Sequence, residues 1–103
     1  IAQFVPEPFF ETIVQESLKM PARVWKAAIT GLRTAEAPSA FDAPCWLAWG
    51  DRDTVIAREE QSALCAQLPQ ARLTVYEGTG HSPHWELPHR VARDLCAFLT
   101  ETA

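Results

Sequence analysis

The feature that most constrains the fold is a short, unbroken apolar run, CWLAW at 45–49, which Gly50 closes. Both faces of such a run must be covered, which is typical of a central strand in a parallel sheet. A second strand is predicted at 71–77, and a helix at 58–68 lies between the two strands. A further helix with an apolar stripe follows Pro88. This strand–helix–strand–helix order predicts an α/β fold built on a parallel sheet.

Two short helices are predicted before this part of the chain, at 9–20 and 21–33. Pro21 ends the first helix and suits the first turn of the second, because proline has no backbone N–H to donate. Gly31 is expected to stop the second helix. The stretch at 34–44, TAEAPSAFDAP, is rich in small residues and proline, and we expect it to be a connector without regular structure.

The predicted sheet is too small to stand alone. Two parallel strands with their helices cannot cover both faces of a sheet and also protect both edges. We therefore expect the chain to be the C-terminal end of a larger sheet, and the alternative is that it pairs with another copy of itself. In either case, its exposed sheet edges are expected to drive self-association.

Charge and composition narrow the classes of partner. The net charge is −4 and the nine basic residues form no cluster, so nucleic acid is not an expected partner. No stretch approaches the ~20 apolar residues of a membrane span, so no membrane insertion is expected. The three cysteines, Cys45, Cys65 and Cys96, lack both paired and metal-type spacing. We expect them to be buried free thiols in a reducing compartment, the cytoplasm.

Two loops contain residues suited to catalysis, and they occupy matching positions. The first, GDRD at 50–53, follows the first predicted strand, and the second, GTGHSPH at 78–84, follows the second strand. Catalytic groups collect at the carboxyl ends of neighbouring parallel strands. A carboxylate of the first loop can therefore reach His81 of the second. Such a carboxylate fixes the histidine tautomer and stabilises the imidazolium that forms when the ring accepts a proton.

Ordinary turn chemistry is the alternative interpretation of each loop. Aspartate and histidine flanked by glycine are common turn residues, and Asp53 can cap the following helix. Asp51 is expected to be a solvated loop charge. The catalytic interpretation is favoured because both loops follow strand ends, in the order that a pair requires.

The segments PCWLAWGDRDTVI and ARLTVYEGTGHSPHWELPHRVARDLCAFL together resemble the C-terminal portion of α/β-hydrolase-fold enzymes of the esterase or lactonase type. The resemblance covers residues 44–99 and includes G-x-x-D, G-x-G-H, E-x-P and a final amphipathic helix. It implies that Asp53 is the acid and His81 the base of a catalytic triad. It also implies that neither a metal nor an organic cofactor is required.

The nucleophile of that triad is missing. The chain order in this family is nucleophile, acid, histidine, and no G-x-S-x-G elbow, or its aspartate equivalent, occurs in the sequence. The resemblance thus implies a C-terminal fragment of a hydrolase that acts on ester-type or related small apolar substrates, inactive by itself. Residues 1–36 are expected to be the end of its helical cap, and 37–103 the C-terminal part of its core.

Two more residues are candidate substrate contacts. Trp25 either lines an apolar pocket or packs between cap and core, and His84 either borders the site entrance or packs on the surface. His81, His84 and His89 lack the accompanying ligands of a metal site, so no metal is expected. The alternative to a hydrolase is a non-catalytic interaction or oligomerisation module that pairs through its sheet edge and cap helices.

Overall fold

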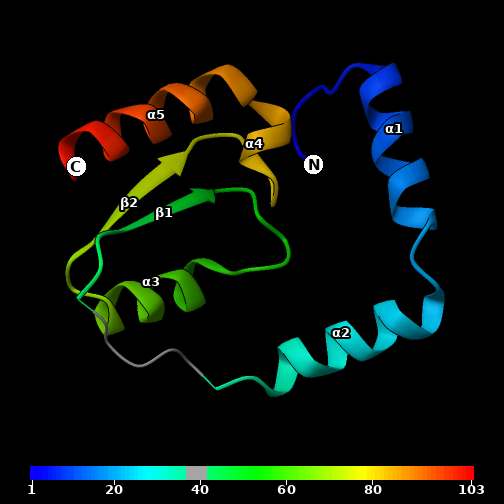
Figure 1. Ribbon diagram of the computed structural model, residues 1–103, viewed down its shortest axis with the longest axis horizontal. Helices are drawn as coiled ribbons and strands as arrows, with labels where there is room; N and C mark the ends of the chain where they lie inside the picture. The colour runs from blue at the N-terminus through cyan, green and yellow to red at the C-terminus, as the bar shows by residue number, and fades with distance from the viewer. Residues whose placement is uncertain (37–41) are drawn as a thin grey trace. The chain divides into compact units, whose positions relative to one another are not determined.

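A computed structural model describes residues 1–36 and 42–103. These residues form two compact units, one of residues 1–4 and 42–103, the other of residues 5–36. The first unit contains a two-stranded parallel sheet and three helices, and the second contains two helices (Figure 1). The mixed α/β class predicted from the sequence is confirmed for the described residues. The middle of the predicted connector, 37–41, lies outside them.

The second unit consists of α1 (Glu7–Leu18) and α2 (Ala22–Thr34). Each helix is preceded by a proline in extended conformation, Pro6 before α1 and Pro21 before α2. Proline suits these positions because the first N–H groups of a helix have no partner within it. Both predicted helices are therefore present, and the first begins two residues earlier than expected.

The prediction that Gly31 stops α2 is wrong. The helix continues through Gly31 to Thr34, and Ala35 then adopts an extended conformation. A glycine ends a helix by adopting a left-handed conformation after the last turn, and within the described residues Gly78 is the glycine that has a positive φ. In the interior of a helix a glycine costs about 1 kcal/mol relative to alanine, which a helix of this length tolerates.

The sheet pairs β1 (Cys45–Gly50) with β2 (Ala71–Tyr76), and α3 (Arg58–Gln67) connects them. The strands are parallel and in full register, so that Gly50 lies opposite Tyr76 at their carboxyl ends. The loops that follow the two strands therefore start side by side. This is the arrangement that the strand–helix–strand pattern predicts.

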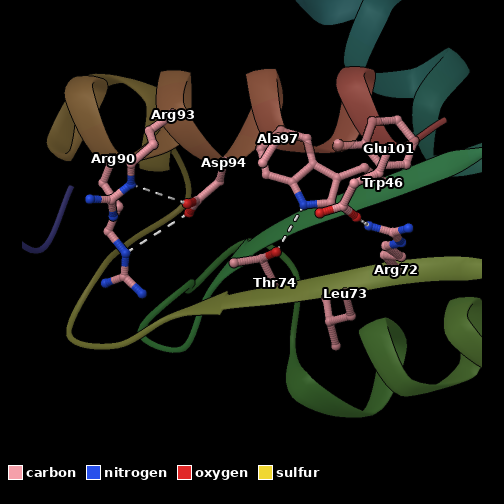
Figure 2. A pocket seen from close by; sticks show the side chains of 10 residues that line it. Trp46, Arg72, Leu73, Thr74, Arg90, Arg93, Asp94, Ala97 and Glu101 are labelled. Carbon is pink, nitrogen blue, oxygen red and sulfur yellow. Dashed lines mark hydrogen bonds and ion pairs between the residues drawn. The ribbon is translucent and has the colours of Figure 1, made fainter. Parts of the chain in front are cut away.

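The last helix, α5 (Pro88–Glu101), and α3 lie on opposite faces of the sheet (Figure 1). On the α5 face, the Trp46 ring stacks on Phe98 with 6.3 Å between centroids. Figure 2 shows the indole Nε1 of Trp46 donating to Thr74 Oγ1 of the neighbouring strand, at 2.9 Å. On the α3 face, the indole of Trp49 donates to the carbonyl of Ile56 at 3.2 Å. The guanidinium of Arg58, the first residue of α3, lies 5.0 Å from the Trp49 ring centroid. The alternation of side chains along β1 thus directs Trp46 to one covering helix and Trp49 to the other.

One short helix, α4 (Pro83–Glu86), is not predicted by the sequence pattern. It is a single turn, too short for hydrophobic periodicity to reveal. Pro83 is suited to its first turn, and the N–H groups of Trp85 and Glu86 bond to the carbonyl of Ser82. The second predicted loop therefore ends in one helical turn, which brings Glu86 back toward the sheet edge.

The cysteines are more exposed than the sequence predicts. The cysteines are free, as expected, but the predicted burial is wrong for Cys96, which is exposed, while Cys45 and Cys65 are half-buried. Leu95, the neighbour of Cys96 in α5, is also exposed. The apolar stripe of this helix is therefore only partly buried. Among the described residues, none of the helices combines the length and apolar character needed to cross a membrane.

Candidate active site

The loops that follow β1 and β2 are joined by hydrogen bonds. The N–H of Asp51 donates to the Tyr76 carbonyl at 3.1 Å, and the N–H of Arg52 donates to the Thr79 carbonyl at 2.9 Å. In return, Asp51 Oδ1 accepts the N–H of Gly78 at 2.7 Å. The expectation that Asp51 is a solvated charge is therefore wrong, because its half-buried carboxylate holds the second loop against the first.

Glycines permit the close approach of these loops. A Cβ atom on Gly50 would overlap the backbone carbonyl groups of Thr79 and Gly80. Gly78 has a φ of 68°, a left-handed conformation that side chains disfavour. Glycine is thus required at position 50 by close contact with the second loop, and at position 78 by the backbone conformation.

The tied loops bring together Asp53 and His81, the two side chains that the sequence analysis pairs. His81 Nδ1 lies 2.9 Å from Asp53 Oδ2. The side chain of Asp53 is 4% exposed and that of His81 is 50% exposed. The carboxylate is therefore inside the protein, and the imidazole extends from it to the surface.

The two oxygens of Asp53 have separate partners. Oδ2 contacts His81, whereas Oδ1 accepts the N–H groups of Val55 at 2.7 Å and Ile56 at 2.9 Å. This second oxygen stabilises a turn before α3, which begins at Arg58. The turn interpretation of Asp53 and its pairing with His81 are thus both present in the structure, but the prediction that Asp53 caps the helix is wrong, because the N-cap of α3 is Ala57.

These hydrogen bonds decide the charge of the site. Burial alone raises the pKa of Asp53, but hydrogen bonds from Ile56, His81 and Val55 outweigh burial and hold the pKa below its ordinary value of 3.8. Asp53 is therefore ionised at neutral pH and accepts without donating. It follows that His81 Nδ1 carries the proton, which leaves Nε2 as the ring nitrogen for proton transfer.

A second buried carboxylate, Glu86, lies behind the histidine loop. Its residue is 6% exposed, and it accepts the N–H groups of Gly80, Ala2 and Gln3. Burial alone raises its pKa, but the hydrogen bonds from Ala2, Gly80 and Gln3 outweigh burial and lower it. Sequence reasoning gives Glu86 no role in the site, although the E-x-P motif five residues after His81 marks its position.

The two predicted substrate contacts, Trp25 and His84, belong to different units of the chain. Trp25 belongs to α2, where its indole donates to the carbonyl of Ser17 at 3.1 Å and so holds α1 to α2. His84 is exposed on α4, with its ring centroid 5.1 Å from that of Trp85. A role in substrate binding stays a prediction for both residues.

A separate hollow lies between α5 and the sheet (Figure 2). Ion pairs line it, with Arg90 and Arg93 on Asp94 and Arg72 on Glu101. Three arginines thus face two carboxylates, which leaves one positive charge in the lining unbalanced. No group of three or more metal-ligating side chains in the described part of the chain could hold a metal ion.

No family model matches this chain, and no curated protein matches it significantly. The geometry of Asp53 and His81 therefore carries the functional proposal. A half-exposed imidazole whose Nδ1–H is held by a buried carboxylate is equipped to act as a general base through Nε2.

Proposed function

We propose that this chain provides the acid and the base of a nucleophile–acid–histidine triad in an enzyme of the α/β-hydrolase type. The observation that supports this most strongly is the 2.9 Å contact of His81 Nδ1 with the buried, ionised carboxylate of Asp53. The position of both residues after neighbouring strand ends is the second support, because catalytic groups of open α/β sheets collect there.

In the proposed reaction, His81 Nε2 takes the proton of a serine hydroxyl as its oxygen attacks the substrate carbonyl. Asp53 stabilises the imidazolium that results. His81 then gives the proton to the leaving alkoxide, and an acyl-enzyme remains. In the second half, His81 takes a proton from water as the hydroxide attacks the acyl group, and it returns that proton to the serine oxygen as the acyl–oxygen bond breaks and the acid leaves. An aspartate nucleophile would attack without deprotonation, and His81 would then serve only the second half.

The substrate class follows from the sequence resemblance. We propose ester-type or related small apolar substrates, hydrolysed without a metal or an organic cofactor. The sequence contains no nucleophile elbow, so the nucleophile must come from polypeptide beyond these 103 residues. The chain by itself is expected to be inactive.

The test measures hydrolysis of activated aryl esters of graded acyl length. A polypeptide that contains this sequence together with a nucleophile elbow should lose about 10⁴-fold or more in kcat when His81→Ala is introduced. The matched control is His89→Ala, which removes an exposed histidine of α5. Robust turnover that survives His81→Ala, either in that polypeptide or in the chain alone, contradicts the proposal.

A non-catalytic module is the second candidate, and exposed apolar side chains favour it. Leu32 of α2 is 75% exposed and Leu99 of α5 is 56% exposed. Within the helical unit, the exposed apolar side chains also include Phe10, Leu18 and Ile29, and apolar side chains gathered on a surface mark protein–protein contact sites. Analytical ultracentrifugation over a range of concentrations tests this: a tight dimer supports the module, and a monomer at high concentration contradicts self-association.

A further inference from the structure

We propose that Glu86 is a positioning residue for His81, which it serves by fixing the backbone at Gly80 and by fastening residues 2–3 against the same loop. The inference rests on the proposed function and deepens it, because it concerns how the base is held. Glu86 lies in α4, outside the two strand-end loops that contain Asp53 and His81.

The first support is the contact of Glu86 with Gly80, the residue that precedes His81. The N–H of Gly80 donates to both carboxylate oxygens, at 3.2 Å to Oε1 and 3.1 Å to Oε2. This hydrogen bond is buried. A charged acceptor in a buried place makes a stronger hydrogen bond than a neutral one, so it fixes the peptide from which the His81 side chain departs.

The second support is steric. A Cβ atom on Gly80 would lie 3.0 Å from Glu86 Oε2 and 3.0 Å from the backbone nitrogen of Ala2. Glycine is therefore the residue that lets the carboxylate and the N-terminal segment approach the loop backbone this closely. Gly80 and Glu86 fit each other as a pair.

The third support is the segment at residues 2–3. The N–H groups of Ala2 and Gln3 donate to Glu86 Oε1 at 2.6 and 2.7 Å. The side chain of Gln3 continues along the loop and donates to Thr79 Oγ1 at 3.2 Å. The Glu86 carboxylate thus joins residues 2–3 to Gly80, more than 70 positions away in the sequence. Thr79, the residue before Gly80, is fully buried.

The loop is consequently held on both sides of Thr79. Asp51 binds the N–H of Gly78 on the first side, and Glu86 binds the N–H of Gly80 on the second. Without Glu86, the hydrogen bond at Gly80 is lost, and the N–H of Gly80 has no charged acceptor. His81 would then move relative to Asp53, although Asp53 keeps its own bonds to Val55 and Ile56.

The test is Glu86→Gln, which keeps the size of the side chain but replaces one acceptor oxygen by an NH₂ donor. The chain is labelled with ¹⁵N-histidine, and long-range ¹H–¹⁵N spectra at alkaline pH report the tautomer of the neutral His81 ring. We expect the parent chain to show the Nδ1–H tautomer. In Glu86→Gln the two ring-nitrogen resonances should move toward each other, because the Asp53 contact is no longer maintained.

The control is Glu59→Gln, which changes an exposed carboxylate in the first turn of α3. It should leave the His81 resonances unchanged. If Glu86→Gln does not fold by circular dichroism, Gly80→Ala provides a milder displacement of the same contact and should give the same shift. Unchanged His81 resonances in a folded Glu86→Gln or Gly80→Ala chain overturn the proposal.

A kinetic measurement separates this proposal from the proposed function. In a polypeptide with its nucleophile, Glu86→Gln should lower kcat by about 10²-fold with little change in KM, as expected for a base displaced by about 1 Å. If His81→Ala has no effect on turnover, the proposed function fails, whatever the spectra show. If His81→Ala abolishes turnover and Glu86→Gln changes neither kcat nor the spectra, the positioning role alone fails.

Discussion

Asp51 Oδ1 accepts a 2.7 Å hydrogen bond from the backbone N–H of Gly78, and so joins the loop after β1 to the loop after β2. The same two loops provide Asp53 and His81. The distance between Asp53 and His81 is therefore set by backbone contacts at the sheet edge as well as by the hydrogen bond between their side chains. Stability of the fold and geometry of the site are coupled at this edge, and the predictions below use that coupling.

Gly50→Ala should destabilise the chain by about 1–3 kcal/mol, the usual cost of inserting a methyl group where there is no room. Its Cβ would overlap the carbonyl groups of Thr79 and Gly80, which are backbone and cannot rotate away. The free energy of unfolding, from urea titration followed by circular dichroism, measures the loss.

Gly31→Ala is the matched control, because its new methyl group meets nothing within 4 Å in the interior of α2. It should stabilise the helix by about 0.5–1 kcal/mol. Equal effects of the two substitutions would contradict the close approach at Gly50.

Acid should weaken the chain through Asp53 and Glu86. Both carboxyl groups have pKa values below their ordinary values of 3.8 and 4.5, because backbone N–H groups stabilise their ionised forms. The stability they contribute is fully present above those ordinary values and is lost as pH falls through the lower folded-state pKa values. The free energy of unfolding should therefore decrease as pH falls below about 5.

The variants Asp53→Asn and Glu86→Gln should each flatten this acid dependence, and Glu59→Gln should leave it as it is. The measurement is urea unfolding at a series of pH values. An acid dependence that is the same in all three variants and in the parent chain would show that the two buried carboxylates are not its source.

Tyr76 should ionise only in strong alkali. Burial, aided by its 2.9 Å hydrogen bond to Asp94 and by the charge of that carboxylate, raises the pKa of Tyr76 to about 12. It is the single tyrosine of the chain, so absorbance near the tyrosinate band reports it alone. The midpoint should lie near 12 in the folded chain and near the ordinary 10.0 in urea.

The sign of the stability effect follows from the raised pKa. The stability that Tyr76 contributes is fully present below about pH 10 and is lost as pH rises through the folded-state value. Asp94→Asn removes the neighbouring charge and should lower the midpoint. A folded chain with a midpoint near 10 would contradict the burial of this hydroxyl group.

The elements that the sequence predicts correctly are those with local signals. CWLAW closed by Gly50 marks β1, and apolar spacing marks α5. The contact of Asp53 with His81 is predictable because topology alone brings together the ends of two strands joined by one helix. Their catalytic role stays a prediction.

The features that the sequence does not predict depend on distant contacts. Glu86 binds Ala2 and Gln3, which lie more than 80 positions away, and no local pattern encodes such a contact. Asp51 looks like any exposed loop carboxylate until Gly78 is placed beside it. These are long-range hydrogen bonds, and propensity and periodicity carry no information about them.

The central claim is that Asp53 and His81 act as one unit in proton transfer, with Asp53 orienting the ring of His81. A double-mutant cycle tests this claim most directly. The measurement is kcat/KM for an activated ester, in a polypeptide that carries its nucleophile, for Asp53→Asn, His81→Ala and the double variant. Residues that act as a unit give strongly non-additive losses. We predict that kcat/KM of the double variant is no lower than that of His81→Ala alone. A loss in the double variant equal to the product of the two single losses would contradict the claim that the residues act as a unit.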